Sequence, residues 1–154
     1  MTDVKPIPDT YPRVTPHLSI DGCAGALDFY QSVLGATVRM RMDAPGGLVA
    51  HAEIVLGNSV IMLGEAALPD SDPSPHKLGG TPVSLFAYVE DVDDVFRRAI
   101  DAGSTAVSEP SYHFYGDRVA TIDDPFGHRW NLATHVEDIA PDELERRAAE
   151  ATAS

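Results

Sequence analysis

Apolar and polar residues alternate along the first half of the chain in a pattern that predicts one strand, one helix and three more strands. The alternating run Val14–Ile20 predicts the first strand. Leu27, Tyr30 and Leu34 then recur at helical spacing as far as Gly35, a residue suited to end a helix. Three further strands are expected over residues 37–42, 49–56 and 59–63, with the two-residue turn Gly57-Asn58 between the last two.

The second half repeats this order. A run rich in Val, Phe and Tyr predicts a strand over residues 83–89, and Asp91 is suited to cap the helix that follows. That helix is expected to end near Gly103, and its apolar face consists of Val92, Val95, Phe96, Ala99 and Ile100. Later strands are expected from residue 105, over 118–122 and over 128–134, with a turn at Asp124-Pro-Phe-Gly127 before the last one.

Each half therefore has the pattern β-α-β-β-β, and the expected fold class is α+β. A sheet with a helix on one face leaves its other face uncovered, so the two modules are expected to pair into a curved mixed sheet around a cleft, within the chain or across a dimer. The expected boundaries are an N-terminal tail (1–13), a single domain (14–135) made of module 1 (14–64), a linker (65–82) and module 2 (83–135), and a short C-terminal helix or tail (136–154).

Composition narrows the class of protein. The chain is 44% hydrophobic and 23% charged, which argues against disorder and against a coiled coil. No apolar run reaches the ~18 residues of a membrane span, and the N-terminus lacks the apolar core of a signal peptide. The net charge of −13 argues against nucleic acid and anionic membranes as partners. Cys23 is the single cysteine, which fits a cytoplasmic protein, and we interpret it as a packing residue rather than a nucleophile.

Strand alternation predicts which side chains face the cleft. The apolar members of each strand are expected to pack beneath the helices, so the residues of opposite parity face inward. The candidate ligand-binding residues on this basis, together with two from the loop described next, are Thr15, His17, His51, Glu53, Met62, Ser84, Phe86, Tyr88, Tyr115, Arg118 and Asn131. Hydroxyl, imidazole, thioether and aromatic groups around one carboxylate suit a ligand pocket; the alternative is the solvated outer face of a sheet.

An aromatic segment precedes the strand that begins near Arg118. Tyr112, His113, Phe114 and Tyr115 are expected to form a loop before Gly116. Aromatic rings at the mouth of a cleft can stack on flat or cationic ligands and act as a lid. The alternative is that they close the end of the barrel or a dimer interface. A short helix beginning at Pro141 is likewise expected either to dock on a partner subunit or to be a solvated tail.

These residues and motifs resemble the vicinal-oxygen-chelate superfamily, which includes glyoxalase I, extradiol dioxygenases and the fosfomycin- and bleomycin-resistance proteins. The resemblance spans about Val14 to His135, and its motifs are Asp28-Phe-Tyr-Gln-Ser-Val-Leu-Gly35, Val89-Glu-Asp-Val92 and Asp124-Pro-Phe-Gly-His-Arg-Trp130. The run Phe114-Tyr-Gly-Asp-Arg118 is similar to the PhnB-like branch. The resemblance implies a homodimer, but it does not fix the reaction, because the superfamily carries out many chemistries on one scaffold.

The resemblance also implies where a metal would bind. The family's metal positions correspond to Thr15, Met62, Ser84 and Asn131, and none of these is His, Asp, Glu or Cys. Thioether, hydroxyl and amide groups are poor ligands for Mg²⁺, Mn²⁺ or Zn²⁺. We therefore expect no metal or other cofactor, with a divalent metal as the alternative.

His51 and Glu53 are the candidate catalytic residues, because an imidazole and a carboxylate two positions apart lie on one face of one strand. His17 is expected on the same face, roughly 10 Å away at the backbone if one strand lies between them, which makes a shared zinc ion strained. His51 could serve as a general base. Alternatively, His51 and Glu53 pair with each other, or with Arg39 or Arg41 on the adjacent strand.

Three functions remain open at this stage. The first is a protein that binds a small cationic or aromatic molecule without a catalytic metal, in the manner of bleomycin-resistance proteins. The second is an enzyme of lyase or isomerase type with His51 or Glu53 as its base, or a metal-dependent glyoxalase-like lyase. The third is a non-catalytic dimeric regulatory module.

Overall fold

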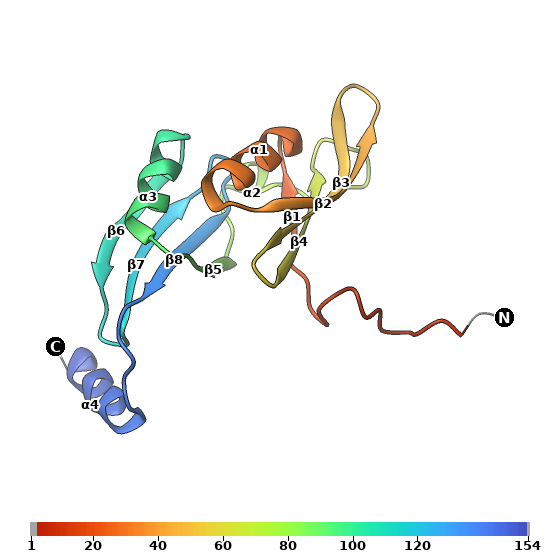
Figure 1. Ribbon diagram of the computed structural model, residues 1–154. Coiled ribbons are helices and arrows are strands. Elements are labelled where there is room, and N and C mark those ends of the chain that lie inside the picture. Colours follow the sequence, from red (N-terminus) through yellow and green to blue (C-terminus); the bar gives the residue numbers. More distant parts are fainter. Residues whose placement is uncertain (1–2, 154) are drawn as a thin grey trace. The chain divides into compact units, whose positions relative to one another are not determined.

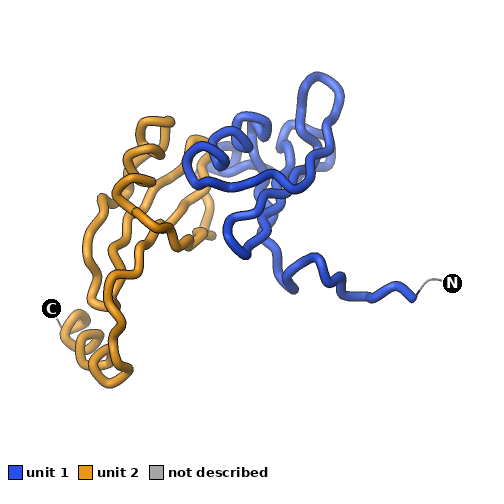
Figure 2. The backbone as a smooth tube through the Cα atoms, viewed as in Figure 1, with its two compact units in different colours: residues 1–79 blue, residues 80–154 orange. Residues whose placement is uncertain are grey.

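A computed structural model describes residues 3–153 and shows the element order expected from the repeat (Figure 1). The chain divides into two compact units, one ending at Gly79 and the other beginning at Gly80 (Figure 2). Unit 1 contains β1 (His17–Ile20), α1 (Cys23–Leu34), β2 (Thr37–Ala44), β3 (Leu48–Leu56), β4 (Ser59–Glu65) and α2 (Pro75–Leu78). Unit 2 contains β5 (Ser84–Tyr88), α3 (Val92–Asp101), β6 (Thr105–Tyr112), β7 (Asp117–Asp123), β8 (Arg129–His135) and α4 (Pro141–Thr152).

Each unit holds one four-stranded mixed sheet, and the two sheets have the same topology. The strand orders are β1-β4-β3-β2 and β5-β8-β7-β6. In each sheet the first pair is parallel and the other pairs are antiparallel. The expected α+β class with two β-α-β-β-β modules is confirmed. Pairing of the two modules around a common cleft stays a prediction.

Specific residues explain where α1 ends and where α1 and α3 begin. Gly35 follows α1 with a φ of 70°, a left-handed conformation that glycine adopts without steric cost. Asp91 accepts a hydrogen bond from the backbone N–H of Asp94 at 3.1 Å, as expected for the cap of α3. The start of α1 has no side-chain cap of its own, and Glu65 on β4 supplies one by accepting from the N–H groups of Gly22 and Cys23 at 3.2 and 2.9 Å.

One helix packs against one face of each sheet, and the core lies between them. In unit 1, Leu27 and Tyr30 of α1 are buried together with the strand residues Ile20, Ala52 and Leu63. In unit 2, the buried residues of α3 lie with Ala87, Ile122, Trp130 and Leu132. The expected alternation is therefore observed, and the opposite face of each sheet is left for polar and aromatic side chains.

Cys23 belongs to the core of unit 1. Its side chain is buried at the start of α1. Burial, reinforced by the nearby Glu65 carboxylate, raises the pKa of its thiol to about 11. A thiol that stays protonated at neutral pH is a weak nucleophile, which supports the interpretation of Cys23 as a packing residue.

Three elements differ from the pattern-based expectation: β1, the linker, and β6, which ends at Tyr112, a residue expected in the following loop. The first strand begins at His17 instead of Val14, since Pro16 has no backbone N–H to donate. The linker contains the short helix α2, which the pattern did not predict. It begins with Pro75 after Ser74, whose hydroxyl accepts from the N–H of Lys77 at 3.3 Å.

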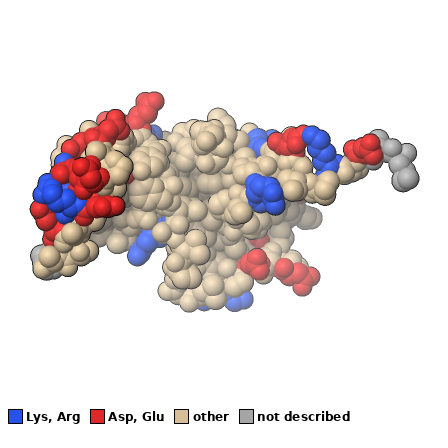
Figure 3. Space-filling model, turned by 90° about the horizontal axis from the view of Figure 1, so that it is seen from below, with Lys and Arg blue, Asp and Glu red and all other residues tan. Residues whose placement is uncertain are grey.

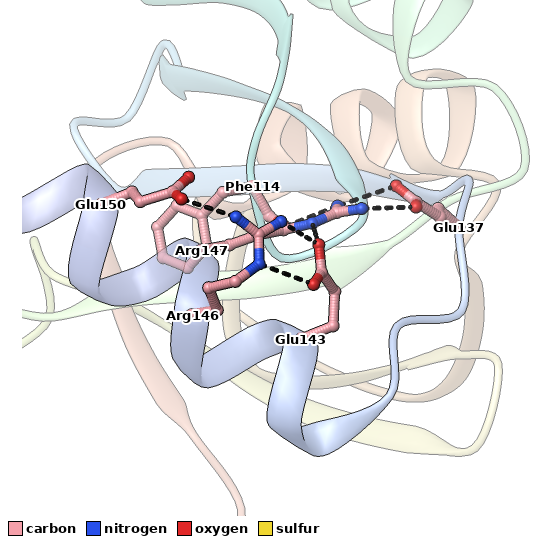
Figure 4. A network of polar contacts seen from close by, with 6 residues as sticks. All are labelled: Phe114, Glu137, Glu143, Arg146, Arg147 and Glu150. Atoms are coloured by element: carbon pink, nitrogen blue, oxygen red, sulfur yellow. Dashed lines mark hydrogen bonds and ion pairs between the residues drawn. The ribbon is translucent and has the colours of Figure 1, made fainter.

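The C-terminal helix α4 begins at Pro141 as expected and is attached to its own unit by an ion-pair network (Figure 4). Arg147 pairs with Glu143 and Glu137 at 2.9 Å each, and it donates to the carbonyl of Phe114 at 3.2 Å. Acidic and basic side chains lie intermixed around this helix (Figure 3). None of its residues is buried, so polar contacts rather than a packed apolar stripe hold it in place. Within residues 3–153, no helix is long and apolar enough to cross a membrane.

Candidate functional site

An imidazole–carboxylate centre lies in unit 1, on the face of the sheet opposite α1. His17 on β1 and Glu53 on β3 both stand beside Met62 of the intervening strand β4. His51 lies two positions before Glu53 and shares its face. The structure therefore brings together the candidate residues His17, His51, Glu53 and Met62.

Gly64 explains how the two histidines approach each other although β4 separates their strands. Their ring centroids are 5.9 Å apart, with the planes inclined by 23°. A Cβ atom at Gly64 would lie 3.1 Å from Cε1 of His17, so the ring of His17 lies across the position that a side chain at Gly64 would fill. The stacked rings, which the backbone separation alone did not predict, depend on this glycine.

Glu53 is the centre of this cluster. Its exposed fraction is 1%, and three groups donate to its carboxylate. The Tyr11 hydroxyl lies 2.9 Å from both oxygens, Arg39 Nε lies 2.9 Å from Oε1, and His51 Nε2 lies 3.0 Å from Oε2. Pairing of Glu53 with His51 and with Arg39, one of the alternatives from the sequence, is confirmed, whereas Arg41 pairs with Asp43 instead.

These hydrogen bonds decide the charge of Glu53. Burial by itself raises the pKa of this carboxyl, but the bonds from His51, Tyr11 and Arg39 together outweigh burial, and the pKa falls below its ordinary value. Glu53 is therefore ionised at neutral pH and fully occupied as an acceptor. This suits a group that orients His51 rather than one that removes a proton from a ligand.

Arg39 lies beside Glu53 at a β-bulge in β2. Val38 pairs with Ile54 and Met40 with Glu53, so Arg39 is one extra residue on β2. Val38 shares the face of buried Ile54, so regular alternation already puts Arg39 on the open face with Glu53, and its hydrogen bond to Glu53 shows that it stays there across the bulge. The Arg39 guanidinium then lies 4.4 Å from the centroid of the Tyr11 ring, and its Nη1 donates to the carbonyl of Thr10 at 3.1 Å.

A second polar cluster lies in unit 2, on the sheet face opposite α3. Phe86 and Tyr88 on β5 are 52% and 63% exposed, with ring centroids 5.3 Å apart. The Tyr88 hydroxyl donates to Asp117 at 2.8 Å, and this hydrogen bond raises the pKa of Tyr88. Asp117 is 3% exposed, and its other oxygen lies 2.7 Å from Nδ1 of His135. The second ring nitrogen of His135 lies 2.8 Å from Asp138.

An open hollow of about 440 Å³ adjoins this cluster, and it is lined by Tyr88, Val89, Glu90, Thr134 and His135. Thr134 is committed to structure, because its hydroxyl accepts from the N–H of Val92 and donates to the carbonyl of Val89, both at 2.9 Å. The groups left to meet a ligand in the hollow are the ring of Tyr88, the carboxylate of Glu90 and the imidazole of His135.

The positions where the family holds a metal do not fit one. Asn131 donates to the Ser84 hydroxyl at 3.2 Å and accepts from the Thr121 hydroxyl at 2.8 Å, so the polar atoms of these three residues engage one another. Met62 offers only a soft thioether. Among residues 3–153, no cluster of three or more His, Cys, Asp or Glu side chains could hold a metal ion. The residues at the family's metal positions are therefore poor ligands for a divalent metal.

Three other candidates lie elsewhere. Thr15 precedes β1 and is half-buried, and Tyr115 is half-buried in the turn between β6 and β7. The expectation that Arg118 lines the cleft is wrong. Arg118 follows Asp117 on β7 and therefore faces the α3 side of the sheet, where it pairs with Asp93 through two bonds of 2.7 and 2.8 Å.

Sequence reasoning missed four residues of the two clusters: Tyr11, Asp117, His135 and Asp138. Tyr11 lay in a segment interpreted as a tail. Alternation along the last strand, extended by one residue beyond Thr134, would have found His135 on the same face as Asn131 and Ala133. No signal in the sequence pointed to Tyr11, because it has no periodic neighbours.

Fold and clusters together define a class of protein: an α+β chain of two βαβββ modules, with polar and aromatic groups on the sheet face that the helix leaves open. Residues 14–132 match the model of the Glyoxalase/Bleomycin resistance protein/Dioxygenase superfamily, and the chain belongs to that superfamily.

Several known proteins are similar to the chain. The uncharacterized protein Mb0911c of Mycobacterium bovis is 36% identical over 137 residues, which cover 87% of this chain and 90% of the relative. Among solved structures, TioX from Micromonospora sp. ML1 is 24% identical with a TM-score of 0.62, covering 81% of this chain and 99% of that one. A putative 3-demethylubiquinone-9 3-methyltransferase, PhnB protein, from Bacillus cereus is 17% identical with a TM-score of 0.64, covering 80% and 99%.

Proposed function

We propose that the protein binds a small planar cation, without a catalytic metal, against the aromatic pair Phe86 and Tyr88. The observation that carries this proposal is the exposure of both rings, together with a hollow of about 440 Å³ that the ring of Tyr88 lines. Large aromatic side chains more than half exposed on a sheet face are costly to leave in water, and a flat ligand would cover them.

The charge around the rings favours a cation. Glu90 lines the hollow, and Asp117 and Asp138 flank His135. With His135 protonated, these four groups carry a net charge of −2, since three carboxylates outweigh one imidazolium. A positive charge over the ring of Tyr88 or Phe86 gains a cation–π attraction in addition. The overall charge of −13 draws cations to the surface in general.

The test compares two ligands of nearly the same shape. At pH 8, 9-aminoacridine is a planar cation and acridine is neutral, and calorimetric titration measures the dissociation constant of each. We expect the cation to bind at least about tenfold more tightly, and Phe86→Ala to remove most of that binding. Leu78→Ala, an exposed position in the other unit, is the matched control and should change nothing. Equal affinity for both compounds, or full affinity in Phe86→Ala, would overturn the proposal.

A second candidate function is proton transfer by His51, and the hydrogen bond from His51 to the ionised Glu53 favours it. This bond fixes Nε2 as the donor and leaves Nδ1 of the neutral ring as the base. Proton exchange at the carbon next to the carbonyl of hydroxyacetone, followed by NMR in D₂O, tests it. Wild-type protein should accelerate exchange, and His51→Gln should lose about 10²-fold of that acceleration. A rate equal to that of buffer alone eliminates this candidate.

We also propose that the chain belongs to the PhnB-like branch and forms a homodimer. The motif Phe114-Tyr-Gly-Asp-Arg118 and the fold similarity to the Bacillus cereus protein support the branch. Light scattering after size-exclusion chromatography tests the dimer. A mass of twice the 16.5 kDa chain is expected, and a monomeric mass at micromolar concentration would refute it.

A further inference from the structure

Tyr11 occupies a place in unit 1 that has the properties of a binding site. Its ring lies on the guanidinium of Arg39, with 4.4 Å from Cζ to the ring centroid. Its hydroxyl lies 2.9 Å from each oxygen of Glu53, whose exposed fraction is 1%. A flat ring on a planar cation and a hydroxyl on a buried carboxylate together recognise both ends of a phenol.

The segment that carries Tyr11 is not part of a helix or a strand. Residues 3–13 precede β1, and Val4 and Ile7 on this segment are 81% and 48% exposed. Tyr11 and Thr10 attach the segment to the sheet through Glu53 and Arg39. Few other apolar groups of this segment are covered, so its separation from the sheet costs mainly these polar contacts.

The chemistry of Glu53 makes the place selective. When Tyr11 leaves, the buried ionised carboxylate of Glu53 loses one hydrogen bond. A ligand restores this hydrogen bond only if it brings an O–H or N–H group. A methyl ether of the same shape stacks equally well on Arg39 but leaves the carboxylate short of that bond. A carboxylate ligand is repelled by Glu53.

We propose that Arg39 and Glu53 form a binding site for phenols, that Tyr11 is its built-in occupant, and that a free phenolic ligand enters when the N-terminal segment lifts. This site lies in unit 1 and is independent of the proposed cation site at Phe86 and Tyr88. A ligand must compete with a tethered phenol whose effective concentration is in the millimolar range. Apparent affinity in the wild-type protein is therefore reduced by that competition.

The test removes the occupant and adds it back as a free molecule. The probes are 4-methylphenol, which reproduces the Tyr11 side chain, and 4-methylanisole, which lacks the O–H donor. In full-length Tyr11→Ala we expect 4-methylphenol to bind about tenfold or more tightly than in wild type, and about tenfold or more tightly than 4-methylanisole. Tyr11→Phe is the matched control, because its ring still covers Arg39 but brings no donor to Glu53, and it should bind 4-methylphenol more tightly than wild type and less tightly than Tyr11→Ala.

Two further measurements separate this site from others. Adding Glu53→Gln to Tyr11→Ala should weaken the preference for the phenol over the ether, because the amide accepts a hydrogen bond without the charge, whereas adding Phe86→Ala should leave it intact. In the wild-type chain, saturating 4-methylphenol should shift the backbone amide signals of Thr10 and Tyr11. The proposal is overturned if Tyr11→Ala binds both probes equally or no better than wild type. If Tyr11→Ala does not fold, the wild-type titration decides: amide shifts that 4-methylphenol causes only in unit 2 overturn the proposal.

Discussion

At the scale of single residues, each unit contains one buried carboxylate held by a phenol and an imidazole. Glu53 accepts from Tyr11 and His51, and Asp117 accepts from Tyr88 and bonds to His135. A buried charge is tolerated only when such partners replace water. The two carboxylates are not equivalent by the repeat, because the position that corresponds to Glu53 beside Asn131 is Thr121. The two polar clusters therefore use non-equivalent positions, although each lies on the sheet face that the helix of its unit leaves uncovered.

Replacing Glu53 by Gln should destabilise unit 1. The amide keeps the shape of the side chain but leaves Arg39 without its counter-charge and weakens the bonds from Tyr11 and His51. We expect a loss of about 2 kcal/mol in the free energy of unfolding at pH 7, measured by urea denaturation. Asp43→Asn, which breaks the exposed pair with Arg41, is the control and should cost less than about 0.5 kcal/mol. Similar costs for the two variants would contradict the role given to Glu53.

His135 should make stability depend on pH. Its hydrogen bond to Asp117, and then its bond to Asp138, raise its pKa above the ordinary value of 6.5. A raised pKa means that the folded state holds the proton more tightly than the unfolded state does. The stabilisation is therefore complete below about pH 6.5 and is lost as the pH rises through the folded-state value.

The measurement for His135 is the melting temperature at a series of pH values from about 5 to 9. The difference between wild type and His135→Gln should be largest at the acidic end and shrink as the pH rises. Titration of the His135 ring protons by NMR gives the folded-state pKa directly, and a value below 6.5 would sink this interpretation.

At the scale of elements, equivalent places in the two modules serve one structural purpose with different chemistry. Glu65 at the end of β4 caps α1, and Thr134 near the end of β8 caps α3. A helix start needs acceptors for its free N–H groups, and either a carboxylate or a hydroxyl supplies one. The two modules therefore share this arrangement: the fourth strand of each module in chain order, β4 or β8, presents an acceptor to the start of the helix of that module.

Gly116 fixes the attachment of the segment that leads into α4. Its φ is 93°, and a Cβ atom there would lie 2.3 Å from the carbonyl oxygen of Glu137. Its own carbonyl accepts from the N–H groups of Val136 and Glu137 at 2.9 and 3.1 Å. Gly116→Ala should therefore cost about 3 kcal/mol, since backbone must move as well as adopt a strained φ.

A matched glycine separates the two causes in Gly116→Ala. Gly46 has a φ of 82° and open space around its Cβ position, so Gly46→Ala carries the strain without the clash. We expect about 1 kcal/mol for Gly46→Ala by urea denaturation. Equal costs at the two positions would mean that the contact with Glu137 does not matter.

At the scale of the whole molecule, acidic residues outnumber basic ones by 24 to 11. Ion pairs such as Arg146–Glu143 and Arg98–Asp94 are exposed and neutralise charge locally. Exposed pairs contribute little to stability, whereas an uncompensated net charge of −13 repels itself in the folded state. Long-range repulsion should therefore outweigh the surface pairs.

Added salt should stabilise the protein. Raising NaCl from about 10 to 300 mM shortens the Debye length from about 30 to 6 Å and screens the net repulsion. We expect the melting temperature at pH 7 to rise by several degrees, measured by circular dichroism. The same salt increase near the isoelectric point of 4.6, where net charge vanishes, is the control and should give a smaller shift. A fall in melting temperature at pH 7 would show that the ion pairs dominate.

The sequence by itself determined the β-α-β-β-β order of each module, the end of α1 at Gly35, the start of α3 at Asp91, the turn at Gly57-Asn58 and the shared sheet face of His17 and His51. These features depend on residues a few positions apart, where periodicity and backbone preference act directly. Such signals also carry the superfamily resemblance, since its motifs lie at helix and turn boundaries.

Only the tertiary structure decided which partners meet on the open faces. Tyr11 reaches Glu53 across 42 positions, and Tyr88 reaches Asp117 across 29. The register of β2 against β3 puts Arg39 beside Glu53, whereas alternation along β7 puts Arg118 on the helix side. Contacts of this kind depend on strand order, register and bulges, and a shift of one residue reverses them, so no local pattern encodes them.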